Sequence, residues 1–296
     1  MWIILVLFWA SCISVIKEFQ ILYTYRSLLL LASPLLFAAL GETIVIISGG
    51  FDLSVGVIVS SATAIASLTM YLDPLLSIAL VLIFGAAIGT INGLGVVKGR
   101  IDSFIMTLGT MFAVNGVALV IRPEPGGYID PTFSQLILYT VSGFPVTSII
   151  LFVIVSVTGV ALLQRRNFGR ELYAVGGDKE RARRAGIKVD QVEFLAYVIS
   201  GICSAMGGLV LAGQISTGDA TIGLPYLFNA FIAVVLGGTL AGVGGFLQVI
   251  PAVLLMTSIP SLIRFLEMTS WYDFVVKGII LIAVVAVQQR ITRRRL

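Results

Sequence analysis

Almost the whole chain consists of apolar runs that are long enough to cross a lipid bilayer, and this pattern restricts the fold more than any other feature. A membrane-spanning helix needs about 20 consecutive, mainly apolar residues. Runs of this kind lie near residues 1–16, 28–48, 53–72, 75–97, 103–121, 146–164, 193–213, 225–241, 246–266 and 271–289. The sequence therefore predicts an all-α, polytopic membrane bundle of about ten transmembrane helices, with residues 1–296 forming a single transmembrane domain.

The composition excludes a water-soluble globular protein. Only 11% of the residues are charged, whereas a soluble domain carries about 25%. The net charge of +4 does not indicate nucleic-acid binding, because the basic residues cluster at the ends of apolar runs and are not interleaved with exposed aromatic residues. We therefore expect contact with membrane lipid and none with nucleic acid.

Chemistry that depends on histidine or on clustered cysteines is also excluded. The chain contains no histidine, and Cys12 and Cys203 both lie inside apolar runs. This arrangement predicts neither a disulfide framework nor a metal site. The run 1–16 has the length of a signal peptide but lacks a positively charged start, so a short first span is expected.

One long polar segment, residues 164–193, interrupts the apolar pattern and is strongly basic. Its basic residues are Arg165, Arg166, Arg170, Lys179, Arg181, Arg183, Arg184 and Lys188, and those of the C-terminal tail are Arg290, Arg293, Arg294 and Arg295. The positive-inside rule places both segments in the cytoplasm. Four candidate spans separate them, an even number that agrees with this placement. Counting back along the chain predicts an N-in/C-in topology.

Within this polar segment the sequence predicts a short helix of about two turns over residues 178–185. Gly176-Gly177 precede it, Asp178 suits the N-cap, Glu180 lies in the first turn and Gly186 suits the C′ position. Its surface combines a small apolar side with basic residues, namely Ala182 with Arg181, Arg183 and Arg184. Such a helix is marginal alone in water. From the residues alone, it either docks on a partner or lies on anionic lipid.

A second group of polar residues lies inside or beside the apolar runs. Glu42 and Asp52 flank a predicted helix break at Gly49-Gly50. A charge at bilayer depth costs at least about 2.5–3.5 kcal/mol, so such residues face protein or a cavity. For Asp52 the pattern favours an N-cap of the following helix, whereas for Glu42 a path-lining role and a structural role stay equally open. The candidate residues of a translocation path or structural motif are Glu42, Gly49, Gly50, Asp52, Ser54, Asn92, Asn115 and Asn229.

The three asparagines in this group have two interpretations. Interhelical hydrogen bonds, each contributing about 0.6–2 kcal/mol, explain Asn92, Asn115 and Asn229 without a functional role. The alternative is that they line a path for a polar solute.

Five segments resemble one known family. They are ISGGFDLSVG at 47–56, NGLGVVKGRIDSFIMTLGTM at 92–111, FGRELYAVGGDKERARRAGIKV at 168–189, AVVLGGTLAGVGG at 233–245 and WYDFVVKGIILIAVV at 271–285. In this order they resemble the permease subunits of ribose-type bacterial ABC importers. The resemblance covers most of the chain.

This resemblance implies a transport subunit rather than an enzyme. It implies a partnership with a second permease chain, identical or homologous, with two cytoplasmic ATP-binding cassette subunits and with an extracytoplasmic solute-binding protein. ATP and magnesium would be bound by the ATPase subunits, and this chain would hold no cofactor; the chain itself has no GxxxxGK[ST] phosphate-binding loop. The implied location is the bacterial cytoplasmic (inner) membrane, and the implied cargo is a monosaccharide or a related small polar solute.

In this family, the segment that matches 168–189 supplies the coupling helix, which sits in a groove of the ATPase. The candidate ATPase-coupling residues are therefore Gly176, Gly177, Asp178, Glu180, Arg181, Ala182, Arg183, Arg184 and Gly186. Importers of nucleosides and of branched-chain amino acids belong to related groups, although the GG-x-DLS element favours carbohydrate. Two other classes stay open: an ion-coupled secondary transporter that uses Glu42 or Asp52, and an intramembrane enzyme that uses the two as an acid/base pair.

Overall fold

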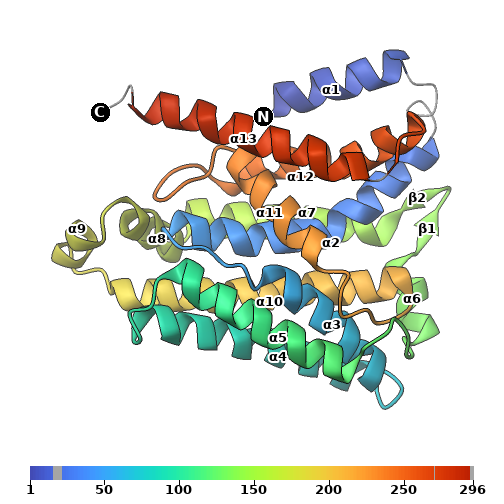
Figure 1. Ribbon diagram of the computed structural model, residues 1–296, viewed down its shortest axis with the longest axis horizontal. Helices are drawn as coiled ribbons and strands as arrows, with labels where there is room; N and C mark the ends of the chain where they lie inside the picture. Colours follow the sequence, from blue (N-terminus) through green and yellow to red (C-terminus); the bar gives the residue numbers. More distant parts are fainter. Residues whose placement is uncertain (16–21, 270, 294–296) are drawn as a thin grey trace.

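The computed structural model describes residues 1–15, 22–269 and 271–293 of the chain, and almost all of its elements are helices (Figure 1). The helices are α1 (Trp2–Val15), α2 (Leu22–Ile47), α3 (Val55–Thr69), α4 (Pro74–Val97), α5 (Ser103–Ile121), α6 (Pro131–Ile137), α7 (Val146–Arg165), α8 (Asn167–Gly177), α9 (Lys179–Arg184), α10 (Val189–Ile215), α11 (Leu224–Leu236), α12 (Phe246–Phe265) and α13 (Trp271–Arg293). The long helices lie side by side along the longest axis of the molecule. The predicted polytopic helical bundle is confirmed at this level.

Length and composition identify fewer spanning helices among the described residues than the ten apolar runs of the sequence. Among the described residues, six helices are long and apolar enough to cross a membrane: α2, α4, α5, α7, α10 and α12. Helices α1, α3 and α11 are apolar but shorter. The 13 residues of α11 extend about 20 Å, which is less than the roughly 30 Å of a bilayer core. The predicted total of about ten spans and the N-in/C-in topology stay predictions.

Helix α10 is the centre of the bundle, and α2, α3 and α4 pack against it. Its contact with α4 is very close because glycines face the α10 backbone. A Cβ added to Gly89 would overlap the carbonyl oxygen of Tyr197, and one added to Gly85 would overlap that of Gly201. In lipid, where no hydrophobic effect drives helices together, such small residues permit close backbone packing.

Both long central helices, α2 and α10, are followed by a non-helical segment and then by a short helix. Residues 48–54 lead from α2 into α3, and residues 216–223 lead from α10 into α11. The second segment runs antiparallel beside α3: the Asp219 N–H donates to Thr63 Oγ1 (3.0 Å) and the Gly223 N–H donates to Ser60 Oγ (2.8 Å). Non-helical backbone at membrane depth is tolerated only where protein or a cavity covers it. The predicted spans 53–72 and 225–241 are longer than the helices that they contain, because α3 ends at Thr69 and α11 ends at Leu236.

The longest loop between the predicted spans, residues 122–145, contains local structure. Helix α6 is followed by a hairpin of β1 (Thr140–Val141) and β2 (Phe144–Pro145), in which Thr140 pairs with Pro145. Asp130 caps α6 by accepting the N–H groups of Thr132 (2.8 Å) and Phe133 (3.2 Å). The hydrogen bond from the Phe133 N–H is the main reason that the pKa of Asp130 lies below its ordinary value.

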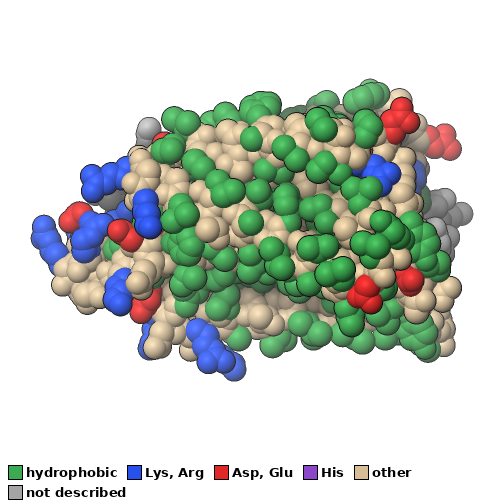
Figure 2. Space-filling view, turned by 90° about the horizontal axis from the view of Figure 1, so that it is seen from below, with side chains coloured by type: hydrophobic (Ala, Val, Ile, Leu, Met, Phe, Trp, Pro, Cys, Tyr) green, Lys and Arg blue, Asp and Glu red, His purple; other side chains and the backbone are tan. Residues whose placement is uncertain are grey.

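The surface divides into an apolar middle and a charged end. Figure 2 shows hydrophobic side chains over the middle of one face and most of the visible Lys and Arg side chains at the end that carries α8 and α9. We call this the basic end; the turn between α4 and α5, with Arg100, also lies there. Such a distribution is typical of a helical bundle in lipid with one polybasic face.

Candidate functional site

The basic segment contains the short helix that the sequence predicts. In α9, the Asp178 carboxylate accepts the N–H of Arg181 (3.0 Å), as an N-cap does. Gly186 adopts φ +85°, its N–H bonds to the Arg183 carbonyl (3.0 Å), and the next N–H, of Ile187, bonds to the Ala182 carbonyl (3.1 Å). This pair of bonds is a Schellman motif. Both predicted caps are confirmed, while the coupling role of these residues stays a prediction.

The segment before α9 differs from the prediction. Gly176 and Gly177 do not belong to a loop, because they form the last turn of a further helix, α8. The polar interruption is correspondingly shorter than 164–193, because α7 continues to Arg165 and α10 begins at Val189. The sequence holds a signal for α8 in the buried Leu172 and Val175, which lie three residues apart on one face. The many charges around them obscured this pattern.

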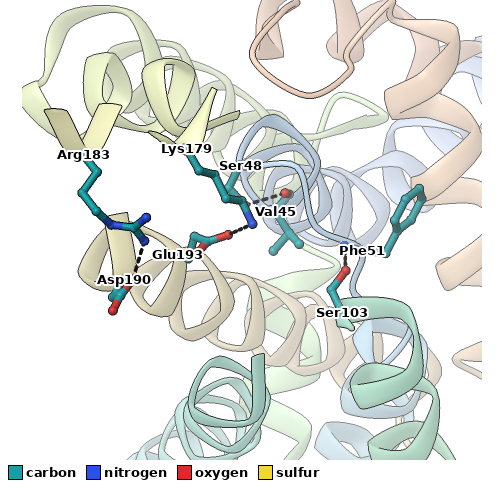
Figure 3. Close-up of polar contacts among 8 residues, drawn as sticks. All are labelled: Val45, Ser48, Phe51, Ser103, Lys179, Arg183, Asp190 and Glu193. Atoms are coloured by element: carbon teal, nitrogen blue, oxygen red, sulfur yellow. Dashed lines mark hydrogen bonds and ion pairs between the residues drawn. The ribbon is translucent and has the colours of Figure 1, made fainter. Parts of the chain in front are cut away.

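Helix α9 presents different residues to the bundle and to solvent. Lys179 Nζ lies 2.5 Å from Glu193 Oε1, and Arg183 lies 3.6 Å from Asp190, so two ion pairs join α9 to the start of α10 (Figure 3). Arg183 also pairs with Glu180 at 2.6 Å. The Ala182 side is buried against the core.

The outward face of α9 carries the remaining cations. Arg184 is exposed, and the side chain of Arg181 is 86% exposed although it pairs with Asp178 at 2.9 Å. An exposed ion pair contributes only about 0–1 kcal/mol. The Arg181 and Arg184 guanidinium groups are therefore available to a partner.

The second candidate region is the α2–α3 break, residues 48–54. Helix α2 ends in another Schellman motif: Gly49 has φ +90°, its N–H bonds to the Ile46 carbonyl (3.0 Å), and the Gly50 N–H bonds to the Val45 carbonyl (3.0 Å). Gly50 has no room for a side chain, because a Cβ would overlap the hydroxyl of Tyr197. The predicted break at Gly49-Gly50 is confirmed.

Phe51 follows the two glycines and is held through its backbone. Its N–H donates to Ser103 Oγ (3.2 Å), and its carbonyl accepts a hydrogen bond from Thr107 Oγ1 (3.3 Å), both on α5 (Figure 3 shows the first). Its ring packs against the ring of Phe231 of α11, with 5.6 Å between the centroids and 44° between the ring planes. The Phe51 side chain remains 39% exposed.

Asp52 is the centre of a buried polar network. Its Oδ1 accepts the N–H (3.1 Å) and hydroxyl (2.6 Å) of Ser54, and its Oδ2 accepts the hydroxyl of Ser200 (2.7 Å). Asn92 Nδ2 donates to Ser54 Oγ (2.8 Å). The network thereby joins the break to α3, α4 and α10. The predicted N-cap role of Asp52 is wrong, because Ser54 occupies that position and Asp52 precedes it by two residues.

Glu42 lies one turn before the end of α2 and is 2% exposed. Within the part of the chain that the structure describes, its Oε2 has no hydrogen-bond partner, as is also true of Asn92 Oδ1 and the Tyr197 hydroxyl. Asp52 is close enough to act on the Glu42 carboxyl electrostatically. The structure therefore places both acids inside the bundle, but only Asp52 is well hydrogen-bonded.

The other two asparagines are not brought to this network. Asn115 on α5 and Asn229 on α11 are each half-buried, and neither contributes a side-chain hydrogen bond to Asp52 or Ser54 within the described residues. Their path-lining role stays a prediction.

The two candidate regions are neighbours. A polar cavity of about 650 Å³ lies between α9, the start of α10, the α4–α5 turn and the break. The residues that line it include Lys179, Glu193 and Tyr197 together with Gly49 and Gly50. Sequence reasoning missed Ser103, Thr107, Tyr197 and Ser200, because isolated hydroxyls in apolar runs resemble ordinary packing residues.

The comparison with known proteins decides the family. Residues 24–285 match the family described as branched-chain amino acid transport system / permease component. A ribose import permease of Bacillus subtilis is 37% identical over 262 residues, which cover 85% of this chain and 80% of the relative. The chain belongs to the permeases of ribose-type ABC importers.

Other relatives agree with this membership. The ribose import permease of Haemophilus influenzae is 33% identical over 258 residues, covering 84% of this chain and 80% of the relative. The L-arabinose transport system permease of Escherichia coli is 29% identical over 296 residues, covering 96% and 88%. Among solved structures, PsaBC from Streptococcus pneumoniae in complex with Fab has a TM-score of 0.50 at 14% identity and covers 94% of this chain and 95% of its own, which shows a likeness of fold.

Proposed function

We propose that this chain is the membrane-spanning subunit of an ATP-driven importer for a monosaccharide or a related small polar solute. Its similarity to ribose and L-arabinose permeases supports the class of cargo. The single observation that carries the mechanism is the capped helix α9, which stands at the basic end with Arg181 and Arg184 turned outward. On this proposal, the basic end faces the cytoplasm of a bacterial cell and the chain lies in the cytoplasmic membrane.

The energy for transport comes from partners. Two ATP-binding cassette subunits bind ATP and magnesium and receive α9 from each of two paired permease chains, identical or homologous. An extracytoplasmic binding protein delivers the solute at the opposite end, near α6 and the hairpin. Binding of ATP closes the ATPase pair, moves the α9 helices and shifts the bundle between inward-facing and outward-facing states. The permease forms and breaks no covalent bond.

The proposal is tested on the complex of this chain with its ATPase subunits. In the double variant Arg181→Glu/Arg184→Glu, repulsion replaces attraction at the outward face of α9, while the ion pairs of Lys179 and Arg183 with α10 stay intact. We expect the ATPase subunits to stop co-purifying and ATP-dependent uptake of radiolabelled ribose or arabinose to be lost.

A matched control separates docking from a general effect of charge. Arg165→Glu/Arg166→Glu makes the same change in net charge at exposed positions of the basic end, outside α9. This variant should co-purify with the ATPase subunits and transport as the parent does. Intact co-purification and uptake in the α9 variant would overturn the docking proposal.

One observation favours a second candidate, an ion-coupled secondary transporter. The Oε2 atom of the buried Glu42 has no hydrogen-bond partner among the described residues, and ionisable residues within membrane helices mark ion pathways. Uptake by the isolated chain in liposomes under a proton or sodium gradient, without ATP, would support this candidate against the first.

A further inference from the structure

At the basic end, three segments that are distant in sequence meet backbone to backbone. The Gly242 N–H, in the glycine-rich loop 237–245, donates to the carbonyl of Ile47 at the end of α2 (2.9 Å). Gly176 of α8 lies against both groups: a Cβ built there would overlap the Ile47 oxygen and approach the Gly242 nitrogen to 2.5 Å. We call Gly176, Ile47 and Gly242 the Ile47 junction.

A side chain reinforces this junction from α8. The Tyr173 hydroxyl donates to the Gly244 carbonyl (2.9 Å), which ties α8 to the same glycine-rich loop. Burial raises the pKa of Tyr173, so its hydroxyl keeps its proton at neutral pH and remains a donor. Leu172 and Val175 are fully buried beside it. Helix α8 is thus fixed to the end of α2 and to the loop before α12.

Helix α9 is closely linked to the junction through α8. Only Asp178 separates the two helices, and its N–H bonds to the Ala174 carbonyl (3.1 Å). Gly176 therefore lies three residues before the first residue of α9. Because the contact at the junction involves backbone atoms with no flexible side chain between them, a displacement of α8 is passed on to Ile47 rather than absorbed.

The route continues from Ile47 to Phe51, four residues later. The Phe51 backbone is held by Ser103 and Thr107 of α5, and its ring packs at a tilt against the ring of Phe231 of α11. The Phe51 side chain is 39% exposed. Phe51 directly follows Gly49 and Gly50, which line the polar cavity at the basic end.

We propose that Gly176 passes the movement of α9 to the α2–α3 break, and that the Phe51 ring on this break closes the solute path toward the basic end. Gly176 is a positioning residue that acts through Ile47, and Phe51 is the gate. This inference rests on the proposed function, because it assumes that α9 is moved by an ATPase. Small shifts are amplified here because the packed contact at the junction is not continuously deformable.

Two adjacent glycines provide the test. Gly176→Ala forces α8 away from Ile47, whereas a Cβ on Gly177 meets nothing within 4 Å, and neither residue has a left-handed φ. In proteoliposomes that contain the complete complex, we expect both variants to retain the ATPase subunits and to hydrolyse ATP. The amount of radiolabelled ribose or arabinose transported per ATP should fall about tenfold in Gly176→Ala and stay at the parental value in Gly177→Ala.

Two further variants keep the inference open to refutation. Tyr173→Phe removes the hydrogen bond to the Gly244 carbonyl without adding volume, so it should lower the ratio of solute transported to ATP hydrolysed by a few-fold. If the Gly176→Ala chain does not assemble with the ATPase subunits, Tyr173→Phe alone tests the role of the Ile47 junction. Phe51→Ala should allow preloaded ribose or arabinose to leak from vesicles without ATP. Equal coupling in all junction variants, or a tight Phe51→Ala vesicle, would overturn the inference. If the parent complex itself shows no ATP-driven uptake, the proposed function fails instead.

Discussion

At the scale of single residues, the two buried acids differ in their hydrogen bonding and therefore in what their removal should do. Asp52 accepts three hydrogen bonds, whereas Glu42 Oε2 accepts none from the described residues. Replacing a well-bonded buried acceptor costs about 1–3 kcal/mol, while removing an unpaired one relieves a desolvation penalty. We expect Asp52→Asn to lower the melting temperature in detergent and Glu42→Gln to leave it unchanged or raise it.

The same pair of variants separates the two transport mechanisms. For an ATP-driven permease, Glu42→Gln should retain ATP-dependent sugar uptake, because no step needs a charge at this position. Loss of uptake in Glu42→Gln at unchanged melting temperature and unchanged ATPase binding would contradict this expectation and favour ion coupling.

Residue-scale features could be predicted from sequence when their partners are local. Asp178 and Gly186 satisfy backbone groups within a few residues, so their types and spacing reveal them. Asp52 could not be assigned in this way, because its partner Ser200 lies 148 residues further along the chain. No local pattern shows which helix faces this carboxylate.

At the scale of helices, the α4–α10 contact gives a second prediction. Gly89→Ala places a methyl group against the Tyr197 carbonyl oxygen, so the helices must separate. We expect a loss of about 1–3 kcal/mol, typical of overpacking. Gly109→Ala on α5 is the control, since a Cβ there meets nothing within 4 Å. The control should be neutral or slightly stabilising, because alanine favours a helix over glycine by about 1 kcal/mol. Thermal unfolding in detergent measures both, and equal effects would refute the packing argument.

The cap of α6 gives a prediction about pH. The pKa of Asp130 is lowered in the folded state, so its carboxylate stabilises α6. This stabilisation is complete above the pKa of aspartate in the unfolded chain, which is about 4. It is lost as the pH falls from that value through the lower pKa of the folded state. Hydrogen exchange at Thr132 and Phe133 should therefore become more protected above this pH than below it, after correction for intrinsic exchange rates. Asp130→Asn should remove most of this dependence; an unchanged pH profile would show that the cap is not its source.

The sequence predicts that a helix exists wherever an apolar run stands alone. It does not predict the length of every such helix. The runs that became α4, α5 and α7 have ends close to those predicted. The runs that contain α3 and α11 were predicted too long, because apolar residues continue beyond Thr69 and Leu236, where the helices end. Helix α8 was missed for the opposite reason: it is polar outside and buries a narrow face.

At the scale of the whole molecule, the sequence predicts an orientation that the fold makes testable. The basic end carries α8 and α9, and α13 also ends there, so the basic loop and the last helix share one end of the bundle (Figure 1). The positive-inside rule places this end in the cytoplasm and the α5–α6 loop on the other side. Both native cysteines are buried, so they should give little background with a thiol reagent.

Single cysteines at exposed positions of the two ends measure this orientation directly. In intact cells, a membrane-impermeant maleimide should label Glu124→Cys in the α5–α6 loop and leave Arg184→Cys in α9 unlabelled until the membrane is permeabilised. The parent chain, which keeps Cys12 and Cys203, serves as the control for background. If the ATPase subunits shield α9, labelling of Arg184→Cys after permeabilisation should rise further when these subunits are omitted. Labelling of Arg184→Cys from outside would reverse the topology and remove α9 from the reach of any cytoplasmic ATPase.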